Sequence, residues 1–160
     1  MDTREQFMKR TRNAYLEEAL WVNERYKEAG FLQSDIAHEL VAIAEHEGLR
    51  AGLGRLVPVK PDCAELGGIY VLPQFRHLGI ATEIVSYLLR QGGTYQRIFC
   101  LPFEHLEHFY SRFGFRPCTE AEAEDVPREV QDKHRWCNSH YEHRTLLLVR
   151  TGPRCQPAAL

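Results

Sequence analysis

The segment Arg76–Ala81 (RHLGIA) combines residue types that can bind a phosphate group. It follows an apolar stretch, Leu66–Leu72, and precedes a stretch with the amphipathic pattern of a helix. A turn at a helix start leaves backbone N–H groups unpaired, and the helix dipole favours negative charge there. Gly79 and Ala81 would let a phosphate approach the main chain closely, and Arg76 adds a cation. The segment therefore predicts a site for a phosphorylated cofactor.

Residues of metal-binding type recur every three positions near the C-terminus, at His134, Cys137, His140 and His143. A strict three-residue step drifts around an α-helix, so four such side chains would not converge on one ion. The five cysteines of the chain are far apart and form no CxxC pair, which argues against a disulfide framework or a zinc knuckle. We expect no metal.

The composition has no strong charge bias. The 160 residues are 44% hydrophobic and 26% charged, which suffices for one domain with its own core. The net charge is −2 and the pI about 6.4, so no basic surface predicts a nucleic acid or membrane partner. The N-terminus is too polar for a signal peptide, and no apolar run approaches about 18 residues. We therefore expect a cytoplasmic protein.

The hydrophobic pattern predicts the elements that must position the phosphate turn. Residues 3–29 have helical spacing, with Gly30 as a stop and a break near Thr11–Asn13 that would give two helices. A hairpin turn is expected at Glu47-Gly48, and Pro58 and Pro61 punctuate a gap before the next strand. The strands predicted before the turn are His38–Glu45, Leu49–Val57 and Ala64–Leu72.

After the turn, a helix is expected at Thr82–Arg90, and residues 119–140 would be helical or looped. The further elements are a strand at Tyr95–Leu101, a helix at Phe103–Phe113, a short strand at Phe115–Cys118 and a final strand at Arg144–Arg150. Residues 151–160 would be a frayed tail. Strands separated by a crossover helix predict one α/β (α+β) domain over residues 1–160, with a mixed sheet and a helical segment over residues 1–30.

A second motif, Phe109–Phe115 (FYSRFGF), follows the next predicted strand and helix. With the Arg76-x-x-Gly79-x-Ala81 pattern, it resembles the GNAT superfamily, the acetyl-CoA-dependent N-acetyltransferases. Their pyrophosphate loop reads Arg/Gln-x-x-Gly-x-Gly/Ala, and Phe-Tyr-x-x-x-Gly-Phe often ends the following helix. The resemblance covers about Val41 to Phe115, extends to Arg144–Arg150 and is poor over the first thirty residues. It implies a mostly antiparallel central sheet flanked by helices.

The resemblance implies acetyl-CoA as acyl donor and assigns its binding groups. The main chain at the end of the strand before the loop would hold the acyl oxygen and the pantetheine chain, through Tyr70, Val71 and Leu72. Beside Arg76, the loop amides that would hold the pyrophosphate belong to His77, Leu78, Gly79, Ile80, Ala81 and Thr82. Many members carry an Asn that contacts the cofactor where this chain has Phe103, a departure from the family pattern.

Two residues match catalytic positions of the family. Tyr110 matches the tyrosine that protonates the leaving thiolate, and the alternative is a core aromatic of the packing motif. Glu65 lies fourteen residues before Gly79, the spacing of the general base in the histone acetyltransferase branch. Strand alternation would place Glu65, Gly67, Ile69 and Val71 on one face of a regular strand, although a Gly pair can also mark a bulge. The alternative for Glu65 is a solvated glutamate at a strand start.

Other polar residues could contribute a base or bind the substrate. His105 and His108 precede Tyr110 on the same predicted helix and could act as a base or lie on the surface. The C-terminal segment is similar to that of small GNAT proteins that acetylate amino acids. Arg128, Lys133 and Arg135 could there bind a substrate carboxylate or form a solvated helix face.

The residues and the resemblance together predict an N-acetyltransferase. It would move an acetyl group from acetyl-CoA to a primary amine, a small molecule or an amino acid, by direct attack in a ternary complex. No cysteine lies where a family nucleophile would, so we expect no acyl-enzyme. The alternatives are a protein or peptide N-acetyltransferase and a non-catalytic acyl-CoA-binding regulatory module. GNAT proteins often form homodimers, which leaves a homodimer open here.

Overall fold

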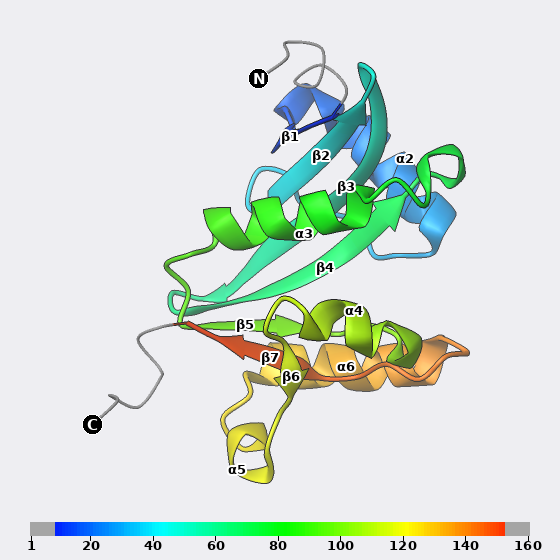
Figure 1. Cartoon of the computed structure of the whole chain (residues 1–160). Helices are drawn as coiled ribbons and strands as arrows, with labels where there is room; N and C mark the ends of the chain where they lie inside the picture. The colour runs from blue at the N-terminus through cyan, green and yellow to red at the C-terminus, as the bar shows by residue number, and fades with distance from the viewer. Residues whose placement is uncertain (1–8, 153–160) are drawn as a thin grey trace. The chain divides into compact units, whose positions relative to one another are not determined.

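The computed structural model describes residues 9–152 (Figure 1). Its strands are β1 (Lys9–Asn13), β2 (Leu40–His46), β3 (Leu49–Lys60), β4 (Cys63–Val71), β5 (Arg97–Cys100), β6 (Arg116–Pro117) and β7 (Leu148–Thr151). Its α-helices are α2 (Ala19–Ala29), α3 (Ile80–Gln91), α4 (Glu107–Ser111), α5 (Glu120–Ala123) and α6 (Arg128–His140). Three 3₁₀ turns are η1 (Leu16–Glu18), η2 (Pro73–Phe75) and η3 (Glu104–Leu106).

The seven strands form a sheet in the order β1-β2-β3-β4-β5-β7-β6. The pairs β1–β2, β2–β3, β5–β7 and β6–β7 are antiparallel, and β4–β5 is parallel. Helix α3 is the crossover between β4 and β5, as a parallel pair requires. This confirms the predicted mixed, mostly antiparallel sheet flanked by helices.

Contacts divide the chain into two compact units. The N-terminal unit is Met1–Val57 with Gly68–Gly92, and the C-terminal unit is Pro58–Gly67 with Gly93–Leu160. Strands β3 and β4 contribute residues to both units. The single domain over residues 1–160 stays a prediction.

The core of the N-terminal unit forms where α2 packs on β2 and β3. Val22 and Tyr26 of α2 are buried with Val41, Ile43 and Leu53 of the two strands. Two glycines of β3 allow α3 to approach closely. A Cβ at Gly54 would lie 2.6 Å from Ile84 Cγ2 of α3, and one at Gly52 3.1 Å from Ile80 Cγ2. A side chain at either glycine would crowd α3. The two glycines therefore allow the start of α3, and with it the phosphate turn, to lie against the sheet.

The core of the C-terminal unit lies between α6 and the strands β4, β5 and β7. It consists of Cys63, Phe99, Val126, Val130 and Val149. Cys63 and Phe99 come from the parallel pair, Val126 from the segment before α6 and Val130 from the first turn of α6. The apolar face of α6 therefore packs on the sheet. A polar side chain of the same helix, Lys133, contacts Glu65.

The prediction of helix from residue 3 to residue 29 is wrong at Lys9–Asn13, which is strand β1. This strand pairs antiparallel with β2, from Lys9 opposite His46 to Asn13 opposite Ala42. Thr and Asn have low helix propensity, so the gain from strand pairing decides the local structure. The start of the predicted helix, residues 3–8, lies outside the described residues, as does most of the predicted tail, residues 151–160.

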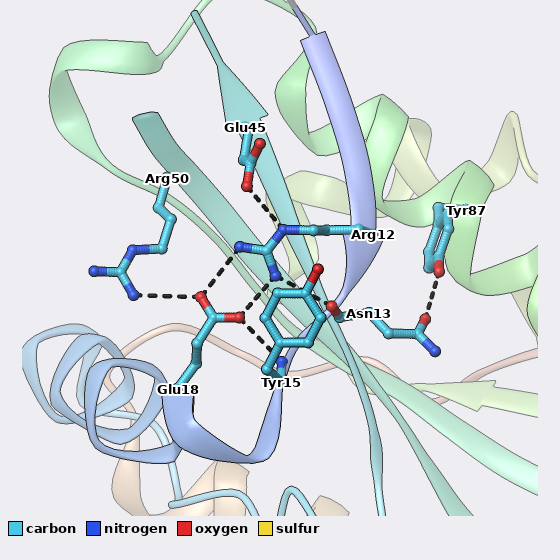
Figure 2. A network of polar contacts seen from close by, with 7 residues as sticks. All are labelled: Arg12, Asn13, Tyr15, Glu18, Glu45, Arg50 and Tyr87. Atoms are coloured by element: carbon cyan, nitrogen blue, oxygen red, sulfur yellow. Dashed lines mark hydrogen bonds and ion pairs between the residues drawn. The ribbon is translucent and has the colours of Figure 1, made fainter. Parts of the chain in front are cut away.

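Ion pairs connect β1 to its surroundings (Figure 2). The Arg12 guanidinium contacts Glu18 at 2.7 Å and Glu45 of β2 at 2.8 Å. Arg12 holds the pKa of the Glu18 carboxyl at about 2, below its ordinary value. Asn13 accepts a hydrogen bond from the Tyr87 hydroxyl of α3. Strand β1 is thus fixed to the 3₁₀ turn before α2, to β2 and to α3.

Several predicted boundaries differ from the structure. Pro58 lies within β3 instead of in a gap. The predicted helix Phe103–Phe113 is a 3₁₀ turn followed by the short helix α4, and residues 119–140 contain α5 and α6. The final strand begins only at Leu148, although Thr145 forms an isolated bridge with Phe103. The predicted hairpin turn at Glu47-Gly48 is confirmed, with both residues at positive φ.

Candidate active site

The predicted phosphate turn lies between η2 and α3 in the N-terminal unit. His77 and Gly79 have left-handed φ angles of 66° and 78°. Gly79 is the N-cap of α3, so the turn ends where the helix begins. The N–H groups of Ile80, Ala81 and Thr82 have no acceptor within the helix, since these are its first residues. Three of the predicted loop amides, those of Ile80, Ala81 and Thr82, thus lie at a helix N-terminus.

The turn is open above Gly79. A Cβ at this position would meet Lys9 Nζ at 4.0 Å as its nearest neighbour. Arg76 is exposed, and its Nε donates a hydrogen bond to the Val71 carbonyl at 3.2 Å, which ties the guanidinium across the base of the turn. The site can therefore accept a phosphate without displacing protein atoms at Gly79.

Lys9 is a residue of this region that the sequence analysis missed. Its Nζ donates a hydrogen bond to the Leu78 carbonyl at 2.8 Å. The two residues are 69 positions apart in the chain, and Lys9 belongs to the strand that was predicted as helix. No pattern in the sequence indicates this contact, because it depends on the pairing of β1.

The end of β4 carries the main-chain groups predicted to hold the acyl oxygen and pantetheine. The Leu72 N–H donates to the Ala51 carbonyl of β3 at 2.9 Å. The Val71 carbonyl accepts from Arg76. The Tyr70 side chain packs against the core of the N-terminal unit. Since the Leu72 N–H is occupied within the sheet and strand alternation directs the Tyr70 N–H to the same side, Val71 is the better candidate for a main-chain contact with the cofactor.

Strand β4 is irregular at Gly68, which has a left-handed φ of 62°. The predicted regular alternation from Glu65 to Val71 on one face is therefore wrong. A Cβ at Gly68 would lie 2.6 Å from the Tyr26 hydroxyl and 3.0 Å from Arg55 Nε, so glycine is required here. The Arg55 guanidinium stacks over the Tyr26 ring at 4.5 Å. Among the described residues, neither Tyr26 Oη nor Arg55 Nη1 has a hydrogen-bond partner.

Glu65 lies in the C-terminal unit, on the part of β4 that pairs with β5. It is 6% exposed, so the alternative of a solvated glutamate is wrong. Its Oε1 forms an ion pair with Lys133 Nζ of α6 at 2.8 Å. A Cβ at Gly67 would lie 3.5 Å from the same oxygen, so the missing side chain leaves space beside the carboxylate.

Tyr110 is buried on α4, with Phe109 and Phe115 packed edge-on at 4.9 and 6.0 Å between ring centroids. Burial raises the pKa of its phenol well above the ordinary value, and the adjacent Cys100 thiol, to which the phenol hydrogen-bonds, adds to this. The phenol is therefore protonated at every physiological pH and can donate a hydrogen bond.

The Cys100 thiol lies near Tyr110, Glu65 and Lys133. Burial raises the pKa of this thiol well above its ordinary value, and the negative charge of Glu65 raises it further. A thiol in this state is a poor nucleophile, because the reactive form is the thiolate.

The histidines lie in different surroundings. His105 and His108 are exposed, and the His105 ring stacks with Phe103 at 6.1 Å. His134 Nε2 lies 2.8 Å from the Thr145 carbonyl. Within residues 9–152, no group of three or more His, Cys, Asp or Glu is arranged to hold a metal ion.

The loop, the sheet and the two motifs are those of an acyltransferase of the GNAT type. The chain matches the family model described as "Acetyltransferase (GNAT) family" over residues 2–115 and belongs to this family.

Solved structures with the same fold include several with CoA or acetyl-CoA. The N-acetylglutamate synthase of Neisseria gonorrhoeae, complexed with coenzyme A and L-arginine, is 20% identical, with a TM-score of 0.70 over 92% of this chain and 34% of that one. The Mycobacterium tuberculosis protein Rv2747, complexed with CoA, is 20% identical, with a TM-score of 0.67 over 89% of this chain and 98% of that one.

A GNAT acetyltransferase of Elizabethkingia anophelis with acetyl-CoA bound is 13% identical, with a TM-score of 0.63 over 90% of this chain and 98% of that one. This chain spans about a third of the length of the Neisseria synthase. At these identities the likeness shows the fold alone. No curated protein matches the sequence.

Proposed function

We propose that the protein transfers the acetyl group of acetyl-CoA to the primary amine of an amino acid or another small molecule, by direct attack in a ternary complex. The observation that carries this proposal is the turn Arg76–Thr82, which presents left-handed residues and unpaired amides at the start of α3 in a chain of the GNAT family. Two of the solved structures with this fold, described above, are of a synthase of an acetylated amino acid and of a protein with bound CoA.

Acetyl-CoA supplies an activated thioester whose carbonyl carbon accepts the amine. The main-chain N–H of Val71 would stabilise the negative charge that develops on the carbonyl oxygen, and the neighbouring main chain at Tyr70 would contact the pantetheine. The loop amides from His77 to Thr82, with Arg76, would hold the pyrophosphate. Each of these groups comes from the N-terminal unit, so the cofactor contacts belong to one compact body.

Glu65 would accept the proton that the amine loses, directly or through a water molecule. An amine attacks only with a free lone pair, so a nearby carboxylate assists the reaction. The missing side chain at Gly67 leaves space at Glu65 Oε1, the oxygen that the ammonium of Lys133 contacts. An alkylammonium bound to this carboxylate has the chemistry expected of a primary amine substrate.

Tyr110 would stabilise the leaving thiolate as a hydrogen-bond donor. Its raised pKa makes complete proton transfer to a thiolate unfavourable, because a thiol is the stronger acid. A hydrogen bond to the thiolate needs no such transfer.

The alternatives differ in the acceptor or in turnover. A protein or peptide acetyltransferase would use the same cofactor groups with a larger acceptor. A regulatory module would bind acetyl-CoA without using Glu65 or Tyr110, and the burial and pairing of Glu65 with Lys133 favour an enzyme over this alternative.

The test is a thermal-shift titration with acetyl-CoA followed by measurement of CoA release with a panel of amines. The panel should contain L-amino acids, their decarboxylated counterparts, polyamines and lysine-containing peptides. Turnover with amino acids and loss of about 10-fold or more in kcat for Tyr110→Phe would support the proposal. Turnover with peptides alone would favour the protein acetyltransferase, and binding without any turnover would favour the module.

A further inference from the structure

Strand β1 brings a positive charge to the phosphate turn. The Lys9 Nζ lies 2.8 Å from the Leu78 carbonyl and 4.0 Å from the position of a Cβ on Gly79. Two of the three ammonium N–H directions remain for other acceptors. Within residues 9–152, no carboxylate forms an ion pair with Lys9, so its charge is not neutralised by a described neighbour.

The position of Lys9 is held by the rest of β1. Arg12 is ion-paired to both Glu18 and Glu45, and Asn13 is hydrogen-bonded to Tyr87 of α3, the helix that begins at the turn (Figure 2). The strand and the turn are therefore fixed to the same helix. An ammonium placed in this way loses little further freedom when it binds an anion, which favours binding.

The other cation of the turn is less available than the sequence indicates. Arg76 Nε already donates to the Val71 carbonyl, and only its terminal nitrogens remain for a ligand. The first turn of α3 also contains the acidic residue Glu83. A diphosphate carries two negative charges at neutral pH, so a second cation beside the amides would match the ligand better than Arg76 alone.

We propose that Lys9 is a ligand of the pyrophosphate of acetyl-CoA, donated by the N-terminal strand to the turn Arg76–Thr82. The ammonium would contact a phosphate oxygen while its hydrogen bond to Leu78 orients it. This role rests on the proposed cofactor site. It adds a binding residue that the Arg-x-x-Gly-x-Ala motif does not contain.

The experiment measures the dissociation constants of CoA, dephospho-CoA and acetyl-pantetheine by calorimetry for the parent and for Lys9→Met. The variant keeps the apolar stem and removes the charge. We expect CoA and dephospho-CoA to bind about 10-fold more weakly, the loss of one charge-assisted hydrogen bond at an exposed site. Acetyl-pantetheine, which lacks the diphosphate, should bind the parent and the variant equally. The KM for acetyl-CoA should rise while kcat stays unchanged.

Two variants serve as controls. Arg10→Met removes a charge from the next residue of β1, whose side chain points to the opposite face of the strand, and should leave CoA affinity unchanged. Lys9→Arg keeps the charge and should recover most of the lost affinity. The melting temperature of each variant shows that folding is intact.

Three results would overturn the assignment: unchanged CoA affinity in Lys9→Met, an equal loss in Arg10→Met, or a loss for CoA that is absent for dephospho-CoA. The last result would move the contact to the 3′-phosphate. Failure of the cofactor site itself is recognised separately, since the parent would then not bind CoA or Gly79→Val would bind it as the parent does.

Discussion

Replacing Gly79 by Val should abolish tight CoA binding while leaving the protein folded. Gly79 has a φ of 78°, where a residue with a Cβ is strained by about 1–2 kcal/mol. The nearest atom to an added Cβ is Lys9 Nζ at 4.0 Å, an ordinary contact distance, so no steric clash within the protein adds to this strain. For a chain of this size, the melting temperature should fall by about 2–8 °C.

The effect on binding has a different origin. A branched side chain at the N-cap of α3 would occupy the space that a phosphate needs to reach the helix amides. Loss of several amide contacts to a diphosphate should weaken CoA binding by about 100-fold or more. Affinity is measured by calorimetry at a temperature well below the lowered melting temperature.

Gly48→Val is a matched control for this experiment. Gly48 has a φ of 80° and no atom within 4 Å of its Cβ position, and it belongs to the hairpin between β2 and β3. The backbone strain should be the same, so the two variants should lose similar stability. Only Gly79→Val should lose CoA affinity. Equal CoA affinity in both variants would refute the pyrophosphate site, and an equal loss in both would show that strain alone explains it.

Three further substitutions test other parts of the structure. Glu65→Gln should lower kcat about 100-fold, most strongly at low pH where the neutral amine is scarce; a loss independent of pH in the pH–rate profile would contradict the base role. Glu18→Gln should lower the free energy of unfolding by about 2 kcal/mol at pH 7. Because Arg12 holds the Glu18 pKa at about 2, this stabilisation is present above pH 4.5 and is lost as the pH falls through 2. The urea unfolding curves of the Glu18→Gln variant and the parent should therefore converge near pH 2. The control Glu17→Gln, at an exposed position, should leave the free energy of unfolding unchanged. Tyr26→Phe should unfold at the same or a higher urea concentration, since the hydroxyl is buried with no partner among the described residues; destabilisation by more than about 1 kcal/mol would reveal a partner.

The parts of the fold that depend on local sequence could be predicted. The turn before α3 needs a residue free to adopt positive φ, and Gly79 supplies it. The hairpin at Glu47-Gly48 and the stop of α2 at Gly30 follow from the same property of glycine. The amphipathic pattern of α3 likewise corresponds to its buried residues, among them Ile84 and Leu88.

The parts that depend on distant contacts could not be predicted. Strand β1 contains two arginines, a lysine and no large apolar residue, so its sequence lacks the alternation that indicates a strand. Its pairing with β2 and the Arg12 ion pairs supply the stability that local propensity does not. The contact of Lys9 with the Leu78 carbonyl could not be predicted for the same reason. Lys9 was expected on a helix, and only the pairing of β1 with β2 brings it to the phosphate turn.

Lys133 changes how Glu65 can be understood as a base. A carboxylate that is only 6% exposed needs a compensating charge, and removal of that charge from a buried pair is costly. Lys133 supplies the charge from α6, and its side chain is 27% exposed, so it can move toward solvent at modest cost. A substrate ammonium could then replace Lys133 on the same oxygen without leaving the carboxylate unpaired. The Glu65–Lys133 pair of the free protein thus has the charge arrangement that the proposed binding of an amine would require.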